Sequence, residues 1–226
     1  SFSALAAASY DVQIRDAAHN SCIVVLNPAL VITQPAVLNA IVNSINVTCF
    51  GANNGVITIT GATGGYGTYE YSINGGTTWS GLNNFISLVP GTYDVRIRDA
   101  VNPACVLTLI PALVITQPAV LNAVVSRTNV TCYGGSDGLI TITNPSGGYG
   151  TYEYSINGGG SWQASGLFTG LVPGNYNVRI RDAANITCII VLNNALQITQ
   201  PAVLNAIETP TMVTCNGAND GIITIT

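Results

Sequence analysis

The sequence contains very few charged side chains and no lysine. Charged residues make up 7% of the 226 residues, against about 25% in an average soluble domain. The basic residues are six arginines, and the formal net charge is -4 at pH 7. Nucleic-acid binding needs a basic surface that neutralises phosphates, so this composition argues against it. Without lysine there is also no P-loop lysine, no Schiff-base lysine and no Lys–Asn isopeptide cross-link.

Histidine and long apolar segments are equally scarce. His19 is the single histidine, which excludes His-rich metal sites and argues against Ser-His-Asp or Cys-His catalysis. No run of about 18 apolar residues lacks Pro, Gln or Asn, so no membrane-spanning helix is expected. We therefore predict a protein that is not an enzyme, has no cofactor or metal, and does not insert this segment into a membrane.

The sequence repeats with a period of 83 residues. Steps of 83 relate three sets of residues: Cys22, Cys105 and Cys188; Cys49, Cys132 and Cys215; Gln34, Gln117 and Gln200. A period this long is a whole small domain rather than one turn of a solenoid. The predicted organisation is the C-terminal part of a repeat (1–35), two full repeats (36–118 and 119–201), and the N-terminal part of a repeat (202–226).

Both ends of the sequence fall inside a repeat. Ser1 aligns with Asn84, and Thr226 aligns with Thr143. One interpretation is that the sequence is a window on a longer polymer. The alternative is that the two incomplete ends complete each other between subunits.

Each repeat carries the signals of about six β-strands. VITIT (56–60) and TYEYSI (68–73) alternate between two faces, as half-buried strands do, and turn residues separate such runs. Asn54-Gly55 predicts a tight type I′ hairpin turn, because both central positions of that turn need a positive φ. No segment has helical periodicity. The pattern is typical of an all-β protein built from tandem immunoglobulin-like β-sandwiches.

A repeated tyrosine follows the expected corner of each sandwich. Pro90-Gly-x-Tyr93 and Pro173-Gly-x-Tyr176 predict tyrosine corners, in which the hydroxyl bonds back to the backbone. Tyr10 occupies the same position of the period. It follows LAAAS instead of the Pro-Gly phrase, which argues against an equally tight corner there.

The ordered motifs resemble those of one bacterial family. Cys-x-Gly-x-x-[Asn/Asp]-Gly-x-Ile-Thr is followed by Gly-Gly-x-x-x-Tyr-x-Tyr-Ser, Pro-Gly-x-Tyr-x-Val-x-x-x-Asp, Cys and Ile-Thr-Gln-Pro. This order resembles the SprB-type repeat of giant gliding-motility adhesins, across essentially the whole chain. The resemblance implies an immunoglobulin-like sandwich, secreted to the cell surface in long tandem arrays.

Two cysteines per period predict disulfides in an oxidising, extracellular compartment. Pairing within repeats would join Cys49 to Cys105 and Cys132 to Cys188, and would leave Cys22 and Cys215 with partners outside the segment. Pairing across repeats would instead join the following pairs: Cys22–Cys49, Cys105–Cys132 and Cys188–Cys215. We favour the first scheme, because alternating antiparallel strands would place the 50–55 and 99–104 turns at the same end of one sandwich.

Other polar motifs predict structural roles. Asp99 with Asn102, and Asp182 with Asn185, supply too few oxygens for Ca²⁺ and suit turn chemistry. Arg96 and Arg98, like Arg179 and Arg181, alternate along a solvent-facing strand, where cross-strand pairing is expected.

The apolar excess gives the clearest indication of function. The segment CVLTLIPALVIT (105–116) is apolar on both faces of a strand, although a sandwich core needs only one. We expect the second face to contact neighbouring repeats or other copies in a surface filament, a structural and adhesive role. The alternative is a carbohydrate-binding module, with surface glycans stacked on Trp79, Trp162, Tyr66 and Tyr149. The simpler interpretation is that each Trp fills the core and each Tyr packs over a Gly-rich turn.

Overall fold

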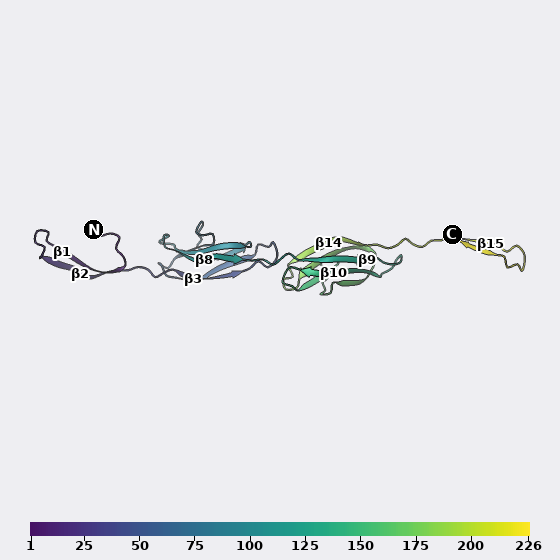
Figure 1. Cartoon of the computed structure of the whole chain (residues 1–226), viewed down its shortest axis with the longest axis horizontal. Coiled ribbons are helices and arrows are strands. Elements are labelled where there is room, and N and C mark those ends of the chain that lie inside the picture. The colour runs from purple at the N-terminus through teal and green to yellow at the C-terminus, as the bar shows by residue number, and fades with distance from the viewer. The chain divides into compact units, whose positions relative to one another are not determined.

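The computed structural model describes all residues from 1 to 226, and its regular structure consists entirely of β-strands (Figure 1). No helix of a length and hydrophobicity that could cross a membrane is present. The chain divides into two compact units. The first comprises Ser1–Val47 and Asn53–Thr116, and the second comprises Thr48–Ala52 and Gln117–Thr226. The all-β fold class is thus confirmed.

The first unit contains a sandwich of two three-stranded antiparallel sheets. One sheet has the order β3 (Asn39–Ile45), β4 (Gly55–Thr63) and β6 (Asn84–Leu88). The other has the order β5 (Tyr69–Ser72), β7 (Gly91–Asp99) and β8 (Val106–Ile115). The six strands fall within one 83-residue repeat, as the alternation of the sequence predicts.

The second unit repeats this arrangement. Its sheets have the orders β9 (Asn122–Thr128), β10 (Gly138–Ser146), β12 (Leu167–Leu171) and β11 (Tyr152–Ser155), β13 (Gly174–Asp182), β14 (Ile189–Ile198). Every strand lies 83 residues after its counterpart in the first unit. The sequence period is therefore a structural period, consistent with immunoglobulin-like repeats.

Strand alternation places one apolar face of each sheet in the core. Ile57 and Ile59 of β4, and Val95 and Ile97 of β7, are 0% exposed. Thr60 lies on the opposite face of β4 and is exposed. Burial of each such Ile or Val contributes about 1.5–3 kcal/mol relative to leaving it in water. The facing apolar rows of β4 and β7 thus hold the two sheets together.

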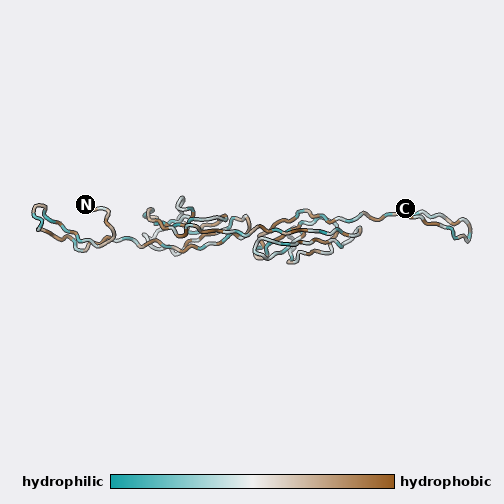
Figure 2. Tube along the Cα trace, in the orientation of Figure 1, coloured by the Kyte–Doolittle hydropathy of each residue, from teal (hydrophilic) through white to brown (hydrophobic).

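Two further hairpins carry halves of the same pattern. The β1 strand (Ala8–Arg15) pairs with β2 (Ile23–Ile32), and β15 (Glu208–Thr211) pairs with β16 (Ile222–Ile225). By the 83-residue period, β1–β2 corresponds to β7–β8, and β15–β16 corresponds to β3–β4. Hydrophobic and hydrophilic residues alternate along both hairpins (Figure 2). Each hairpin is a two-stranded sheet whose apolar side chains are exposed.

The expected tight turn at Asn54-Gly55 is wrong. The β3 strand ends at Ile45 and β4 begins at Gly55, so residues 46–54 form a longer connection. Gly55 does not adopt a positive φ. A Cβ at this position would instead lie 2.9 Å from Ile115 Cγ2 and 3.0 Å from the Leu88 carbonyl oxygen. Glycine is needed here because β6 and β8 approach the backbone closely.

Candidate functional site

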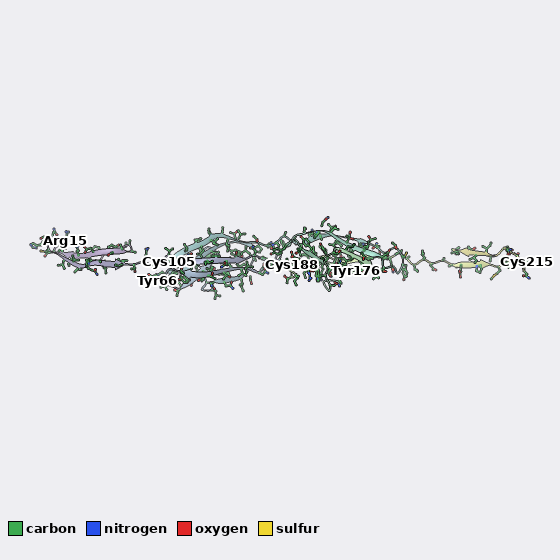
Figure 3. The ribbon with its side chains drawn as sticks, turned by 90° about the horizontal axis from the view of Figure 1, so that it is seen from below. Arg15, Tyr66, Cys105, Tyr176, Cys188 and Cys215 are labelled. Atoms are coloured by element: carbon green, nitrogen blue, oxygen red, sulfur yellow. A yellow bond between two sulfur atoms is a disulfide. The ribbon has the colours of Figure 1, made fainter.

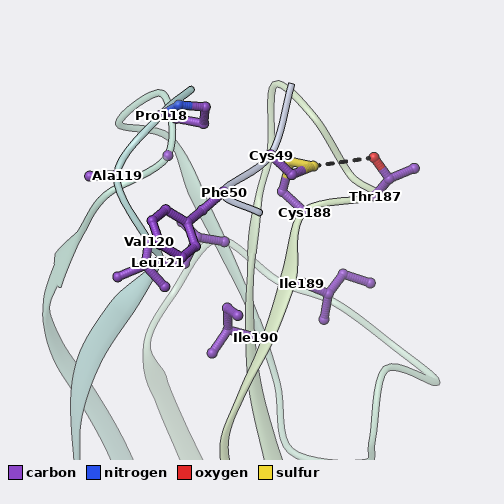
Figure 4. A pocket seen from close by; sticks show the side chains of 11 residues that line it. Cys49, Phe50, Pro118, Ala119, Val120, Leu121, Thr187, Cys188, Ile189 and Ile190 are labelled. Atoms are coloured by element: carbon purple, nitrogen blue, oxygen red, sulfur yellow. Dashed lines mark hydrogen bonds between the residues drawn. A yellow bond between two sulfur atoms is a disulfide. The ribbon is translucent and has the colours of Figure 1, made fainter. Parts of the chain in front are cut away.

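A disulfide joins two successive repeats of the sequence. Cys49 lies in the β3–β4 connection of the first full repeat, and Cys188 immediately precedes β14 of the second. The Cys49 turn, residues Thr48–Ala52, packs with the second compact unit. Figure 4 shows the bond between the two sulfur atoms. The hydroxyl oxygen of Thr187 lies 3.8 Å from the Cys49 sulfur.

The favoured pairing within repeats is therefore wrong for this structure. Cys49 does not bond Cys105, and Cys188 does not bond Cys132. The pairing across repeats, Cys22–Cys49 with its counterparts, is not formed either. The four remaining thiols are free and exposed: Cys22, Cys105, Cys132 and Cys215.

The reason for the wrong pairing lies in the direction of the strands. Val47 donates its backbone N–H to the Thr116 carbonyl oxygen at 2.9 Å, so the turn after β3 lies at the C-terminal end of β8. Cys105 lies at the N-terminal end of that 10-residue strand, which is about 33 Å long at 3.3 Å per residue. The two cysteines of one repeat thus lie at opposite ends of their sandwich.

The Cys49 turn has a fixed conformation. The Ala52 N–H donates to the Cys49 carbonyl oxygen at 3.1 Å, and Gly51 adopts a φ of 74°. The Gly51 N–H donates to the side-chain oxygen of Gln117 at 2.8 Å. A positive φ is costly for residues other than glycine, so the Cys-x-Gly spacing sets this turn.

The second repeat has the same turn at Cys132. The Gly135 N–H donates to the Cys132 carbonyl oxygen at 3.0 Å, and Gly134 donates to the side-chain oxygen of Gln200 at 2.9 Å. Sequence reasoning noted the periodic Gln-Pro pairs but gave them no role. Their period was the available signal, and the structure identifies the glutamine as the acceptor that holds each turn.

An apolar groove of about 160 Å³ lies beside the disulfide. Phe50, next to Cys49, lies beside Val120 and Leu121 in this groove (Figure 4). Pro118 lines one side and Ile190 lines another. Cys188 itself is 7% exposed. The site is therefore a turn seated in an apolar groove and fixed there by a covalent bond.

The two tryptophans do not fill the core. The guanidinium carbon of Arg98 lies 4.5 Å from the centre of the Trp79 ring, and Arg98 also forms an ion pair with Glu70 at 2.6 Å. The second repeat has the same arrangement, with Arg181 at 4.5 Å from the Trp162 ring. One face of each ring is thus covered by an arginine. This leaves less aromatic surface for sugar stacking than the carbohydrate-binding hypothesis assumed.

Asp99 is a structural carboxylate with no exposed surface. It accepts backbone hydrogen bonds from Tyr66, from Val101 at 2.8 Å and from Asn102 at 3.0 Å. The Tyr66 N–H is the main cause that lowers the pKa of Asp99, and the Asn102 and Val101 N–H groups add to it. Gly65 allows this contact, since a Cβ there would lie 2.3 Å from Asp99 Oδ2.

Asp182 has the same geometry in the second repeat. It accepts backbone hydrogen bonds from Tyr149, from Ala184 at 2.8 Å and from Asn185 at 3.2 Å. In both repeats the carboxylate oxygens that the sequence offered as ligands are occupied by N–H donors. No group of three or more His, Cys, Asp or Glu side chains that could hold a metal ion is present.

The repeated tyrosines bond to the backbone four residues upstream. The hydroxyls of Tyr10, Tyr93 and Tyr176 donate to the carbonyl oxygens of Ala6, Val89 and Val172, each at 2.8 Å. This is the bond that a tyrosine corner makes. Tyr10 makes it without the Pro-Gly phrase, because the hydroxyl needs only a carbonyl oxygen at the right distance.

The comparisons with known proteins agree with this repeat structure. The sequence pattern of the SprB repeat matches residues 41–78 and 124–161. Each match runs from β3 or β9, through the cysteine turn, to the residue before the Arg-covered tryptophan. No curated protein matches the chain. The chain therefore carries two SprB repeats, one in each of its sandwiches.

Proposed function

We propose that the chain is a structural and adhesive segment of a secreted bacterial surface filament or giant adhesin. The observation that carries the proposal is the Cys49–Cys188 bond, which ties one SprB repeat to the next. A structural disulfide persists in an oxidising, extracellular compartment rather than in the cytosol. A covalent link between successive repeats also suits a protein that bears mechanical load.

The proposed mechanism is mechanical rather than chemical. Linked sandwiches hold a distal end away from the cell, and weak contacts along many repeats add up through multivalency. Gliding motility is the process in which such a filament would act. The SprB matches support this assignment, because this repeat type belongs to surface proteins.

The location is tested by labelling cells that make the protein. Antibodies raised against the chain should label intact cells, with gold particles along surface filaments seen by electron microscopy. Protease added to intact cells should remove the label. Labelling that requires cell lysis would contradict the proposal.

We propose that the second face of β8 takes part in assembly. Ile115 is 1% exposed, whereas Val114 on the other face is 54% exposed and Val106 is 44% exposed. A Val114→Glu substitution should therefore weaken assembly without unfolding the sandwich. Leu82→Glu, at a loop residue that is 74% exposed, is a matched control. Equal assembly of both variants, measured by light scattering, would rule out this face.

The carbohydrate-binding alternative is tested with the same chain. A glycan array should show no binding that depends on Trp79 or Trp162, because Arg98 and Arg181 cover one face of each ring. Binding that is lost in Trp79→Ala would favour a carbohydrate-binding module instead.

A further inference from the structure

The groove that receives the Cys49 turn has a counterpart in the first unit, which we name the Cys105 groove. It is lined by residues that lie 83 positions before the lining of the occupied groove: Pro35, Val37, Leu38, Gly65, Cys105 and Leu107. Its volume is about 310 Å³, against about 160 Å³ where the Cys49 turn is seated. The Cys105 groove is therefore a copy of a known receptor site without the turn.

Matched residues show what the seated turn covers. Val120 is 45% exposed beside Phe50, whereas Val37 in the Cys105 groove is 81% exposed. Cys188 is 7% exposed in its disulfide, whereas Cys105 is an exposed free thiol. The Cys105 groove thus presents the apolar surface and the sulfur that a Cys-x-Gly turn uses.

A free turn of this kind lies at Cys215, and Figure 3 labels both cysteines. The Ala218 N–H donates to the Cys215 carbonyl oxygen at 3.1 Å, and Gly217 adopts a φ of 83°. This is the conformation of the seated Cys49 turn. The Cys132 turn is less suitable as a donor, since Gln200 of its own chain already occupies its glycine N–H.

The hydrogen-bonding groups around the turn and the groove also match. In the seated turn, Gly51 donates to Gln117. The corresponding donor in the free turn is Gly217, whose N–H makes no hydrogen bond in the structure. Gln34, 83 residues before Gln117, lies in the Cys105 groove and also makes none. A Gly217–Gln34 bond would reproduce the Gly51–Gln117 bond.

The two hairpins carry opposite halves of a sandwich. Ile223 of β16 is 73% exposed, although its counterpart Ile57 in β4 is 0% exposed. Ile14 of β1 is 56% exposed, although its counterpart Ile97 in β7 is 0% exposed. In the complete repeat, these β4 and β7 rows cover each other. The apolar faces of β15–β16 and β1–β2 therefore have complementary patterns.

We propose that the β15–β16 hairpin and Cys215 turn of one copy dock on the β1–β2 hairpin and Cys105 groove of a second copy, joined by a Cys215–Cys105 disulfide. Head-to-tail repetition of this contact makes a polymer. The oxidant is a low-molecular-weight disulfide such as oxidised glutathione. The Cys105 thiolate takes one glutathionyl group and releases one glutathione. The Cys215 thiolate then attacks that mixed disulfide, releasing the second glutathione and forming the protein disulfide.

The test uses purified full chain in a glutathione redox buffer. Non-reducing electrophoresis should show a ladder of oligomers that collapses to the monomer on reduction. Cys105→Ser and Cys215→Ser should each remain monomeric. Cys22→Ser and Cys132→Ser are matched controls, since they also remove exposed thiols, and they should keep the ladder.

Mixing the two inactive variants gives the sharpest result. Cys105→Ser retains the free turn and Cys215→Ser retains the groove cysteine, so an equal mixture should stop at a disulfide-linked dimer. A ladder from either variant alone would overturn the proposal. A wild-type monomer closed by its own Cys105–Cys215 bond, or a mixture without dimer, would do the same.

The apolar contact has its own control. Ile223→Asp should abolish the ladder, whereas Thr224→Asp, at the neighbouring residue on the other face of β16, should preserve it. Equal ladders from both would overturn the hairpin contact. The inference rests on the proposed extracellular role only in needing an oxidising compartment. The defined buffer supplies that condition, so failure of the joint and failure of the surface location are distinguished.

Discussion

At the scale of single residues, the fold depends on a few polar groups that bind the backbone. Asp99 and Asp182 each gather three N–H donors from two segments of a repeat. Asn46 accepts the Thr116 N–H at 2.9 Å, so it ties the β3–β4 connection to the end of β8. These residues explain several polar motifs that a search for ligand sites would otherwise select.

Asp99 gives the structure a specific acid sensitivity. The pKa of Asp99 is lowered by the backbone N–H groups that it accepts. The stabilisation is therefore present above the unfolded-state pKa of about 4, and it is lost as the pH falls through the lower folded-state value. Asp99→Asn should lower the melting temperature of the first unit at pH 7, because its amide would point N–H groups at backbone donors.

Calorimetric melting curves between pH 7 and pH 2 measure this effect. The difference between the wild type and Asp99→Asn should shrink below about pH 4. Glu208→Gln, which removes an exposed carboxylate from β15, is the control and should melt like the wild type. A constant difference at every pH would contradict the assigned role of Asp99.

At the scale of strands, close approach of backbones determines where glycine is required. Gly138 begins β10 as Gly55 begins β4. A Cβ on Gly138 would lie 2.7 Å from the Leu171 carbonyl oxygen and 3.1 Å from Ile198 Cγ2. The Asp137 carboxylate before it accepts the Thr131 hydroxyl at 2.6 Å. The Asp-Gly pair thus organises the start of a strand rather than a tight turn.

Gly138→Ala should destabilise the second sandwich by about 1–3 kcal/mol, because overpacking forces the neighbouring strands apart. Gly174→Ala is the matched control in the same unit, since nothing lies within 4 Å of its added Cβ. Its effect should stay within about 0.5 kcal/mol. Urea titrations followed by tryptophan fluorescence measure both variants. Equal destabilisation would show that the close contact is unimportant.

Periodicity and alternation predicted the strands but not the connections between repeats. The 83-residue step and the VITIT-like runs led to six strands per repeat, because side-chain burial follows the local pattern. The cysteine pairing could not be predicted in this way. It depends on which end of the sandwich the β3–β4 connection occupies, and the assumption that successive strands simply alternate was wrong. The tryptophan position depends on Arg98, which lies on another strand.

At the scale of the whole molecule, the disulfide makes one repeat depend on the next. Cys49 and Cys188 are separated by 139 residues. Closing a loop of that length lowers the entropy of the unfolded chain, worth about 5 kcal/mol in the chain-entropy model. The bond spans most of the two full repeats, so unfolding of the second sandwich should be sensitive to reduction.

Cys188→Ser should therefore lower the unfolding midpoint of the second unit and make it insensitive to reducing agent. The wild type should show the lower midpoint only when reduced. Cys132→Ser, which removes a free thiol of the same unit, is the control and should keep the wild-type response. Identical midpoints for oxidised wild type and Cys188→Ser would contradict a stabilising link.

Disulfide mapping tests the account most directly. Free thiols of the unfolded, unreduced monomer are alkylated, and the chain is digested without reduction and sequenced by mass spectrometry. We predict one linked pair of peptides containing Cys49 and Cys188, with alkyl groups on Cys22, Cys105, Cys132 and Cys215. A peptide that links Cys49 to Cys105 would contradict the account, because each repeat would then be closed on itself.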